Sequence, residues 1–181
     1  MPMPRVVSGT APSATVFNTL AAEIDNLGVR CKVYRTSSLS GIVTTTDLIV
    51  PWQAVQYDTF AATSTPMWSS ATPNYVTIQA GGVYDLAMQE RWSPTGGNGT
   101  GQRAGKIMVN GSSVFANSVC SDKRAADASN EGVTVQTHAV VPLPAGTLIY
   151  TNFWQSSGST ITGLHTDYGG TWLSVKRLGP L

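Results

Sequence analysis

The side chains that commonly carry catalysis or bind metal ions are few in this chain and are widely spaced. Its two histidines, His138 and His165, have no second histidine or carboxylate at ligand spacing, so a histidine metal site is not indicated. No serine lies in a Gly-x-Ser-x-Gly motif, and the acidic residues are scattered singly rather than paired as in glycosidases. We therefore expect no catalytic residues, no metal and no cofactor, and we predict that the protein is not an enzyme.

One glycine-rich segment, residues 96–106, partly matches a phosphate-binding loop. That motif requires glycine at the position of Thr100 and serine or threonine at the position of Ile107, and it precedes a helix. The segment has neither residue and precedes a predicted strand. We interpret it as a surface loop at one end of the fold.

A second polar segment contains three carboxylates that could together hold a calcium ion, those of Asp122, Asp127 and Glu131. Lys123 and Arg124 lie among them and bring positive charge to the same segment. This mixture favours an ordinary solvated loop, and a calcium site remains the alternative.

The composition limits the other classes of function. Of 181 residues, 41% are hydrophobic and only 12% are charged, and the formal net charge is +1. No cluster of lysine and arginine could follow a phosphate backbone, so we expect no nucleic-acid partner. No stretch approaches the ~20 consecutive apolar residues of a membrane span, so we also expect no membrane partner.

The start of the chain and its cysteines indicate the compartment. Residues 1–5 lack the apolar core of a signal peptide, and we expect synthesis in the cytosol. Cys31 and Cys120 are far apart and have no companions, which excludes a CxxC motif or a cysteine zinc site. Free thiols are the expectation for both.

Residues 13–27 are predicted to form one short helix. Ser13 is a suitable N-cap, and Gly28 can adopt the left-handed conformation that ends a helix. Four apolar residues are spaced three and four apart, which places them on one face: Phe17, Leu20, Ile24 and Leu27. About four turns are not stable alone. The stripe must therefore pack on its own domain, on a sister subunit or on another protein.

From residue 29 onward the hydrophobic period changes from 3.6 to 2, which is typical of strands. Pro51 interrupts the second of these strands, and the Asn-Gly pair at residues 110–111 predicts a hairpin. The expected strands are residues 29–36, 47–57, 75–79, 83–92, 106–112, 113–116, 133–141, 147–155 and 171–178. The prediction is an all-β, antiparallel sandwich of about eight to ten strands at residues 29–181, preceded by an attachment segment at residues 1–28.

Four short motifs occur in the order found in the tumour-necrosis-factor-like jelly rolls, the family shared with the globular heads of complement's first component. The matching segments are residues 80–86, which resemble the Gly-x-Tyr-x-Phe strand, 109–111, which resemble the Lys-Asn-Gly hairpin, 144–150, and 170–175. Leu86 stands where the family has phenylalanine, and Thr147 replaces its usual acid. The resemblance covers about residues 31–178 and implies a jelly roll that forms a homotrimer.

The start of the chain has a second resemblance. Residues 5–10, Arg-Val-Val-Ser-Gly-Thr, and the helix that follows are similar to the opening of small virion proteins from tailed bacteriophages. In those proteins such a segment fastens an appended jelly roll to the particle. The resemblance implies a virion location and assembly in the host bacterial cytoplasm, with major capsid or tail proteins as partners.

The aromatic residues allow two interpretations. Those in predicted strands are interpreted as core or trimer-axis residues: Tyr84, Tyr150, Phe153 and Trp172, together with Leu86 on the face of Tyr84. Those at loops or strand ends can stack on a sugar ring or pack at a subunit rim: Trp68, Trp92 and Tyr168.

The leading hypothesis is a non-enzymatic phage virion protein, a trimer of jelly rolls anchored by residues 1–28. Capsid decoration, head fibre and minor tail protein are all compatible with it. One alternative is a carbohydrate-binding module for host adhesion that uses the loops around Trp92, residues 96–105 and Tyr168. A polysaccharide depolymerase is the other.

Overall fold

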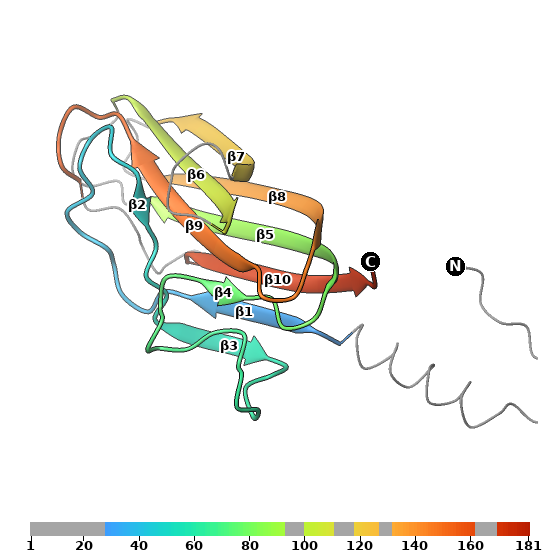
Figure 1. The fold of residues 1–181 in the computed structure, drawn as a ribbon. Helices are drawn as coiled ribbons and strands as arrows, with labels where there is room; N and C mark the ends of the chain where they lie inside the picture. The colour runs from blue at the N-terminus through green and yellow to red at the C-terminus, as the bar shows by residue number, and fades with distance from the viewer. Residues whose placement is uncertain (1–27, 93–99, 111–117, 127–131, 162–169) are drawn as a thin grey trace, which may run out of the picture.

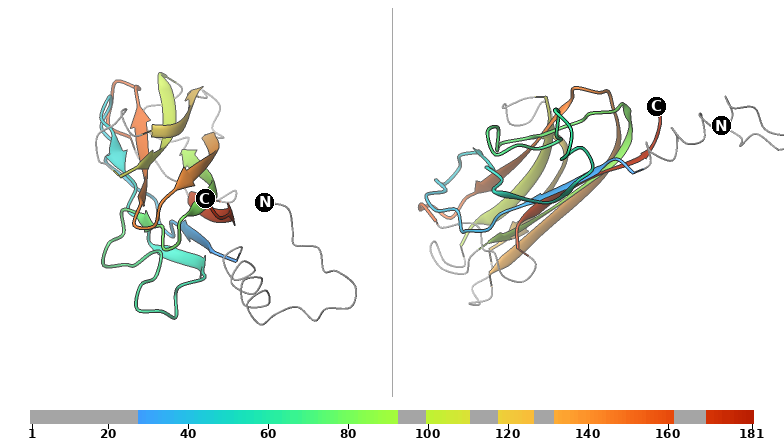
Figure 2. Two further views of the ribbon diagram at one scale, coloured as in Figure 1. Left: turned by 45° about the vertical axis from the view of Figure 1, so that its right-hand side comes forward. Right: turned by 90° about the horizontal axis from the view of Figure 1, so that it is seen from below.

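The computed structural model describes residues 28–92, 100–110, 118–126, 132–161 and 170–181. In this part of the chain ten strands, all paired antiparallel, form two sheets that lie face to face (Figure 1; Figure 2). The predicted helix at residues 13–27, with Phe17, Leu20, Ile24 and Leu27, lies outside the described residues, as do His165 and Tyr168.

The first sheet has the strand order β3-β1-β10-β5-β8. Its strands are β1 (Arg30–Tyr34), β3 (Ala54–Asp58), β5 (Gly82–Trp92), β8 (Val133–Leu143) and β10 (Trp172–Gly179). The last strand thus lies between β1 and β5, and its pairing with β1 joins residues more than a hundred positions apart.

The second sheet has the order β2-β9-β6-β7, and β4 also pairs with β9. Its strands are β2 (Leu48–Ile49), β4 (Val76–Thr77), β6 (Gln102–Val109), β7 (Ser118–Ala125) and β9 (Leu148–Gln155). Both sheets contribute alternate residues to one core, and this arrangement confirms the predicted all-β antiparallel sandwich.

The core is built from the inward-facing positions of the long strands. Tyr84, Leu86 and Met88 of β5 alternate with half-exposed residues and are almost completely buried. From the second sheet Phe153 meets Trp92 edge to face, with ring centroids 5.6 Å apart. The Tyr84 hydroxyl donates to the carbonyl of Ala80 at 2.5 Å, so this large residue is buried with its polar atom paired.

The predicted strand at residues 47–57 is in fact two strands in two different sheets. Pro51, which has no N–H to donate, lies in the gap between β2 and β3. The N–H of Trp52 instead donates to the carbonyl of Pro73 at 2.9 Å. The chain therefore crosses from the second sheet to the first at the proline, which goes beyond the predicted edge or bulge.

The segment around Asp122 also differs from its prediction. We expected a loop that contains Asp122, but Asp122 lies inside β7 and is paired in register with Gly105. The predicted return strand at residues 113–116 lies outside the described residues. Within the strand it accepts a hydrogen bond from the Arg124 side chain at 2.8 Å. Asp127 and Glu131 lie outside the described residues.

Candidate functional site

The outer face of the first sheet carries several exposed apolar side chains. Along β10 the burial alternates, so that Leu173 and Val175 enter the core while the intervening side chains point outward. The large apolar side chains that remain exposed on this sheet include Tyr34 of β1, Val140 of β8 and Leu178 of β10. Such a face is typical of a surface that contacts another molecule.

Two ends of this face differ in character. One end carries aliphatic side chains, which we call the association patch: Val83, Val140, Leu178 and Leu181. The strand register places Val83 opposite Pro142 and Gly179, and Leu181 lies beside Gly81 at the same end. Val140 is 54% exposed and Leu181 72%. Trp172, the first residue of β10, marks the other end of the face. It lies six residues before Leu178, a distance of about 20 Å along the strand.

An unpaired acceptor accompanies the association patch. Asp85 lies opposite Val140 and Lys176 in the register of the sheet. Its Oδ1 atom is buried and accepts no hydrogen bond from a described residue. A buried carboxylate oxygen without a donor is unfavourable, so a donor from a second molecule would stabilise it.

The other end of the face is aromatic and basic. Tyr34 and Trp172 are direct cross-strand partners on β1 and β10. The Lys32 ammonium lies 4.8 Å from the centroid of the Trp172 ring, and the Arg30 guanidinium lies 5.3 Å from that of Tyr57. These contacts hold positive charge on aromatic faces.

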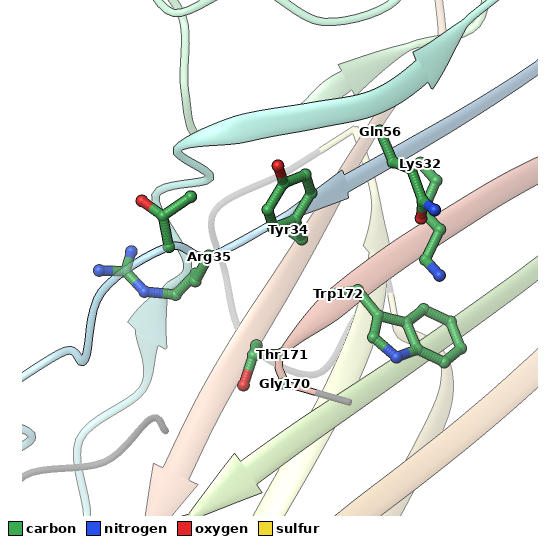
Figure 3. A pocket seen from close by; sticks show the side chains of 8 residues that line it. Lys32, Tyr34, Arg35, Gln56, Gly170, Thr171 and Trp172 are labelled. Carbon is green, nitrogen blue, oxygen red and sulfur yellow. The ribbon is translucent and has the colours of Figure 1, made fainter. Parts of the chain in front are cut away.

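A hollow of about 430 Å³ opens at this end, and we call it the aromatic hollow (Figure 3). The residues that line it come from β1 and the turn after it, from β3, and from the start of β10 with the two residues before it: Lys32, Tyr34, Arg35, Thr36, Gln56, Gly170, Thr171 and Trp172. Neither aspartate nor glutamate is among these described lining residues. The hollow is large enough for a small ligand.

Arg35 is a buried cation in the wall of the aromatic hollow. It is 5% exposed, and burial lowers the pKa of its guanidinium. Its side chain donates to the carbonyls of Ser37, at 3.1 Å, and Pro51. No carboxylate of the described residues forms an ion pair with it. The wall therefore carries a positive charge that the described chain does not neutralise.

A second hollow, of about 290 Å³, lies on the other side of Trp172 over β5 and β8. It is lined by Ala87, Met88, Gln136, Thr137, His138 and Trp172. Trp172 thus separates two concave regions of one face.

The outer face of the second sheet is covered by local contacts. Lys106 forms an ion pair with Asp47 at 2.7 Å, and both side chains are largely buried. Tyr75 packs against Tyr150 with ring centroids 5.4 Å apart, and Lys123 lies 4.7 Å from the centroid of the Trp154 ring. Aromatic groups on this side are therefore already in contact with neighbours.

One carboxyl group is buried inside the sandwich. Glu90 is 1% exposed, and a methyl group on Gly105 would come within 2.6 Å of its carboxyl atoms. Neither Glu90 oxygen accepts a hydrogen bond of normal geometry from a described residue. Burial raises the pKa of Glu90 well above its ordinary value, and the indole of Trp92 and the charge of Lys106 oppose this only in part. The sequence carries one signal for this buried carboxyl: Glu90 follows Met88 by two residues, and alternation in a strand places both on the inward face.

The structure separates the predicted trimer-core residues. Tyr84, Leu86 and Phe153 fill the inside of one protomer and have no surface to offer a second subunit. Trp172 lies on the outer face of the first sheet, whereas Tyr150 lies on the second sheet against Tyr75. Trp172 is the member of this set that lines the two hollows described above.

The aromatic residues predicted to lie at loops or strand ends also differ from one another in burial. Trp92 ends β5 and is 1% exposed, with the Arg103 guanidinium 5.6 Å from its ring centroid, so it is not available to stack on a sugar. Trp68 lies in a loop and is half-buried, and its indole N–H donates to the Pro73 carbonyl at 3.5 Å. Sequence reasoning missed Tyr34 and Lys32, because only the β1–β10 pairing brings them to Trp172. It also missed Arg35, whose N–H donates to the Thr171 carbonyl.

Two further features concern ions and membranes. Within the described ranges, His, Cys, Asp and Glu side chains do not gather in groups of three that could hold a metal ion. Cys31 lies in the first sheet and Cys120 in the second, with no disulfide among the described residues. The described part of the chain contains no helix that is long and apolar enough to span a membrane.

Comparison with known proteins identifies the fold. No protein-family model matches the chain, and no curated protein matches it. Among solved structures, the Eiger TNF from S. frugiperda is 11% identical, with a TM-score of 0.56 over 84% of this chain and 94% of that chain. Murine APRIL at pH 5.0 is 14% identical, with a TM-score of 0.56 over 82% of this chain and 98% of that chain. The chain therefore folds as a TNF-like jelly roll.

Proposed function

We propose that the protein is a non-enzymatic structural component of a bacteriophage virion, displayed as a homotrimer of jelly rolls and anchored by its N-terminal segment. The observation that carries the assembly part is the association patch, which exposes aliphatic side chains next to the unpaired Asp85 oxygen. A second copy of the chain is the proposed occupant of this patch.

The fold supports three copies rather than two. TNF-like jelly rolls usually form homotrimers, and the likeness to this fold extends over more than four fifths of the chain. A threefold arrangement places the patch of each subunit against a different surface of its neighbour and closes into a ring. Burial of apolar side chains would stabilise it by about 25 cal/mol per Å² removed from water.

The virion part of the proposal is supported by the sequence alone. Residues 5–10 and the predicted helix resemble the attachment segments of small phage proteins, and the helix has one apolar stripe. A short amphipathic helix with no stability of its own is suited to docking on a larger assembly. The core described for the two sheets is formed by residues of the sandwich, from Val29 onward.

Deletion of residues 1–28 is expected to give a folded trimer that no longer joins the particle. The measurement is the amount of the protein in purified virions, by quantitative mass spectrometry, after infection of cells that supply only the truncated chain. A full-length variant with alanine at Phe17, Leu20, Ile24 and Leu27 keeps the length and removes the stripe. Incorporation of either variant at the wild-type level would contradict the docking role.

A further inference from the structure

We infer that Asp85 of each subunit forms an ion pair with Lys176 of the neighbouring copy, so that three such pairs lie inside the proposed trimer. This pair rests on the proposed assembly, because it needs a second copy of the chain. It completes an acceptor that a single chain leaves without a donor.

Asp85 is incomplete in a single chain. It lies on the outward side of β5, since its neighbours Tyr84 and Leu86 are buried in the core. Although Asp85 as a whole is only half-buried, its Oδ1 atom is buried and accepts no hydrogen bond from a described residue. Buried polar atoms in folded proteins almost always have a partner. A donor from outside the single chain would satisfy this oxygen.

Lys176 is the cation on the described outer face of the first sheet that is not already engaged. Lys32 and Arg30 lie over aromatic rings, and Arg91 donates to the Oγ1 atom of Thr134 at 3.2 Å. Lys176 is exposed and belongs to neither ion pair of the described residues. An ammonium group can donate three hydrogen bonds, so Lys176 is the donor that association can bring to a carboxylate.

The two side chains lie within the association patch. Asp85 of β5 is opposite Val140 of β8 on one side and Lys176 of β10 on the other (Figure 1). Val83 precedes Asp85 by two residues and Leu178 follows Lys176 by two, so these side chains share one side of the sheet. A second copy that covers the aliphatic side chains therefore also covers this acid and this lysine.

Coverage by a second copy changes the energetics of the two charges. In a single chain the exposed ammonium of Lys176 keeps its hydration, and an ion pair at the surface contributes little. The described residues show no such pair, although Asp85 and Lys176 are direct cross-strand neighbours. In the trimer both charges lose water, and an unpaired buried charge is strongly unfavourable. The assembled form therefore favours pairing of the two.

Threefold symmetry favours pairs between copies. Each copy brings one acid and one lysine at adjacent positions, so a closed ring can alternate three acids with three lysines. A carboxylate has two acceptor oxygens, and in such a ring they face the lysines of two different copies. The interface gains no net charge, and the positions of the charges select one orientation between neighbouring copies.

The test uses two full-length variants, Asp85→Asn and Lys176→Gln, produced together in one cell. One variant carries an N-terminal tag, so that native mass spectrometry resolves both homotrimers and both mixed trimers. Each homotrimer lacks every Asp85–Lys176 pair, whereas a mixed trimer retains one pair between unlike chains. We expect both homotrimers to be depleted about tenfold relative to random mixing. A random distribution among the four species would overturn the inference.

Two controls define the random distribution. The first mixes tagged and untagged wild-type chains. The second mixes Asp122→Asn with Lys123→Gln, an acid and a lysine at adjacent positions in β7 of the second sheet. Both controls should give random mixing, because neither removes a charge from the association patch.

A single variant tests the same pair through loss of the trimer. Lys176→Asp places a second carboxylate opposite Asp85 and is expected to shift the solution mass from three chains to one. Lys123→Asp makes the same change of charge on the second sheet and should remain trimeric. Circular dichroism verifies that both variants are folded. A folded Lys176→Asp variant that stays trimeric would reject the pair.

The outcomes distinguish this pair from the proposed assembly. A wild-type trimer, together with random mixing of Asp85→Asn and Lys176→Gln, rejects the pair and retains the assembly. A wild-type protein that is a monomer rejects both.

Discussion

A Val140→Glu chain is expected to remain folded and to sediment as a single chain of 19.1 kDa rather than as a trimer. Val140 is 54% exposed on β8, so the substitution removes little from the core of one protomer. In the trimer, however, the new carboxylate would be buried against a second subunit beside Asp85, which is its neighbour across the strand pair. Burial of an unpaired charge next to a like charge costs several kcal/mol, enough to dissociate the assembly.

The chain offers a matched control for this variant. Val43 is 50% exposed but lies outside the first sheet, between the bridge at Ile42 and the turn at Thr45. Val43→Glu introduces the same charge at the same exposure and should leave the trimer intact. Analytical ultracentrifugation measures the mass, and circular dichroism reports on the fold. A trimeric Val140→Glu, or equal dissociation of both variants, would place the interface elsewhere.

Replacement of Glu90 by glutamine is expected to stabilise the protein at neutral and alkaline pH. The folded-state pKa of Glu90 lies above that of the unfolded chain, because its carboxyl is buried without a hydrogen-bond partner of normal geometry among the described residues. Folding therefore has no penalty from this group below the unfolded pKa, near pH 4. As pH rises from the unfolded-state pKa to the folded-state pKa of Glu90, the free energy of unfolding decreases, because only the unfolded chain loses the proton.

Glutamine leaves a buried polar group at the site but removes the ionisation penalty, so the expected gain is little at pH 4 and, at pH 8, about 1.4 kcal/mol for each pH unit over which that penalty has grown. Denaturant unfolding at several pH values and one protein concentration measures it. Asp122→Asn serves as control, since it weakens a partly exposed ion pair with Arg124 and should change stability by less than about 1 kcal/mol. If the free energy of unfolding depends on pH in the same way for the wild type and for Glu90→Gln, the pKa of Glu90 is not raised by folding.

The sequence predicted the fold class well because the signal is local. Alternation along residues 83–92 and 171–178 corresponds to β5 and β10, and the Asn-Gly pair lies where β6 ends. The break at Pro51 could also be predicted from the sequence. The sequence did not reveal that β2 and β3 belong to different sheets. A proline marks where strand pairing stops, but it does not indicate which strands pair on either side of it.

The site could be predicted only in part. Trp172 was identified as a candidate from the sequence, but Tyr34 and Lys32 reach it only through a pairing of residues far apart in the chain. Alternation alone also does not distinguish the inner from the outer face of a strand. For that reason Tyr84 and Phe153, which lie inside one protomer, were grouped with Trp172, which lies outside.

The most direct test of the account is the solution mass of the purified full-length chain, measured by light scattering over a range of concentrations. A TNF-like jelly roll that associates through the patch around Val140 is predicted to give three times the 19.1 kDa chain mass at every concentration tested. A monomer that persists at the highest concentration would contradict the proposed assembly.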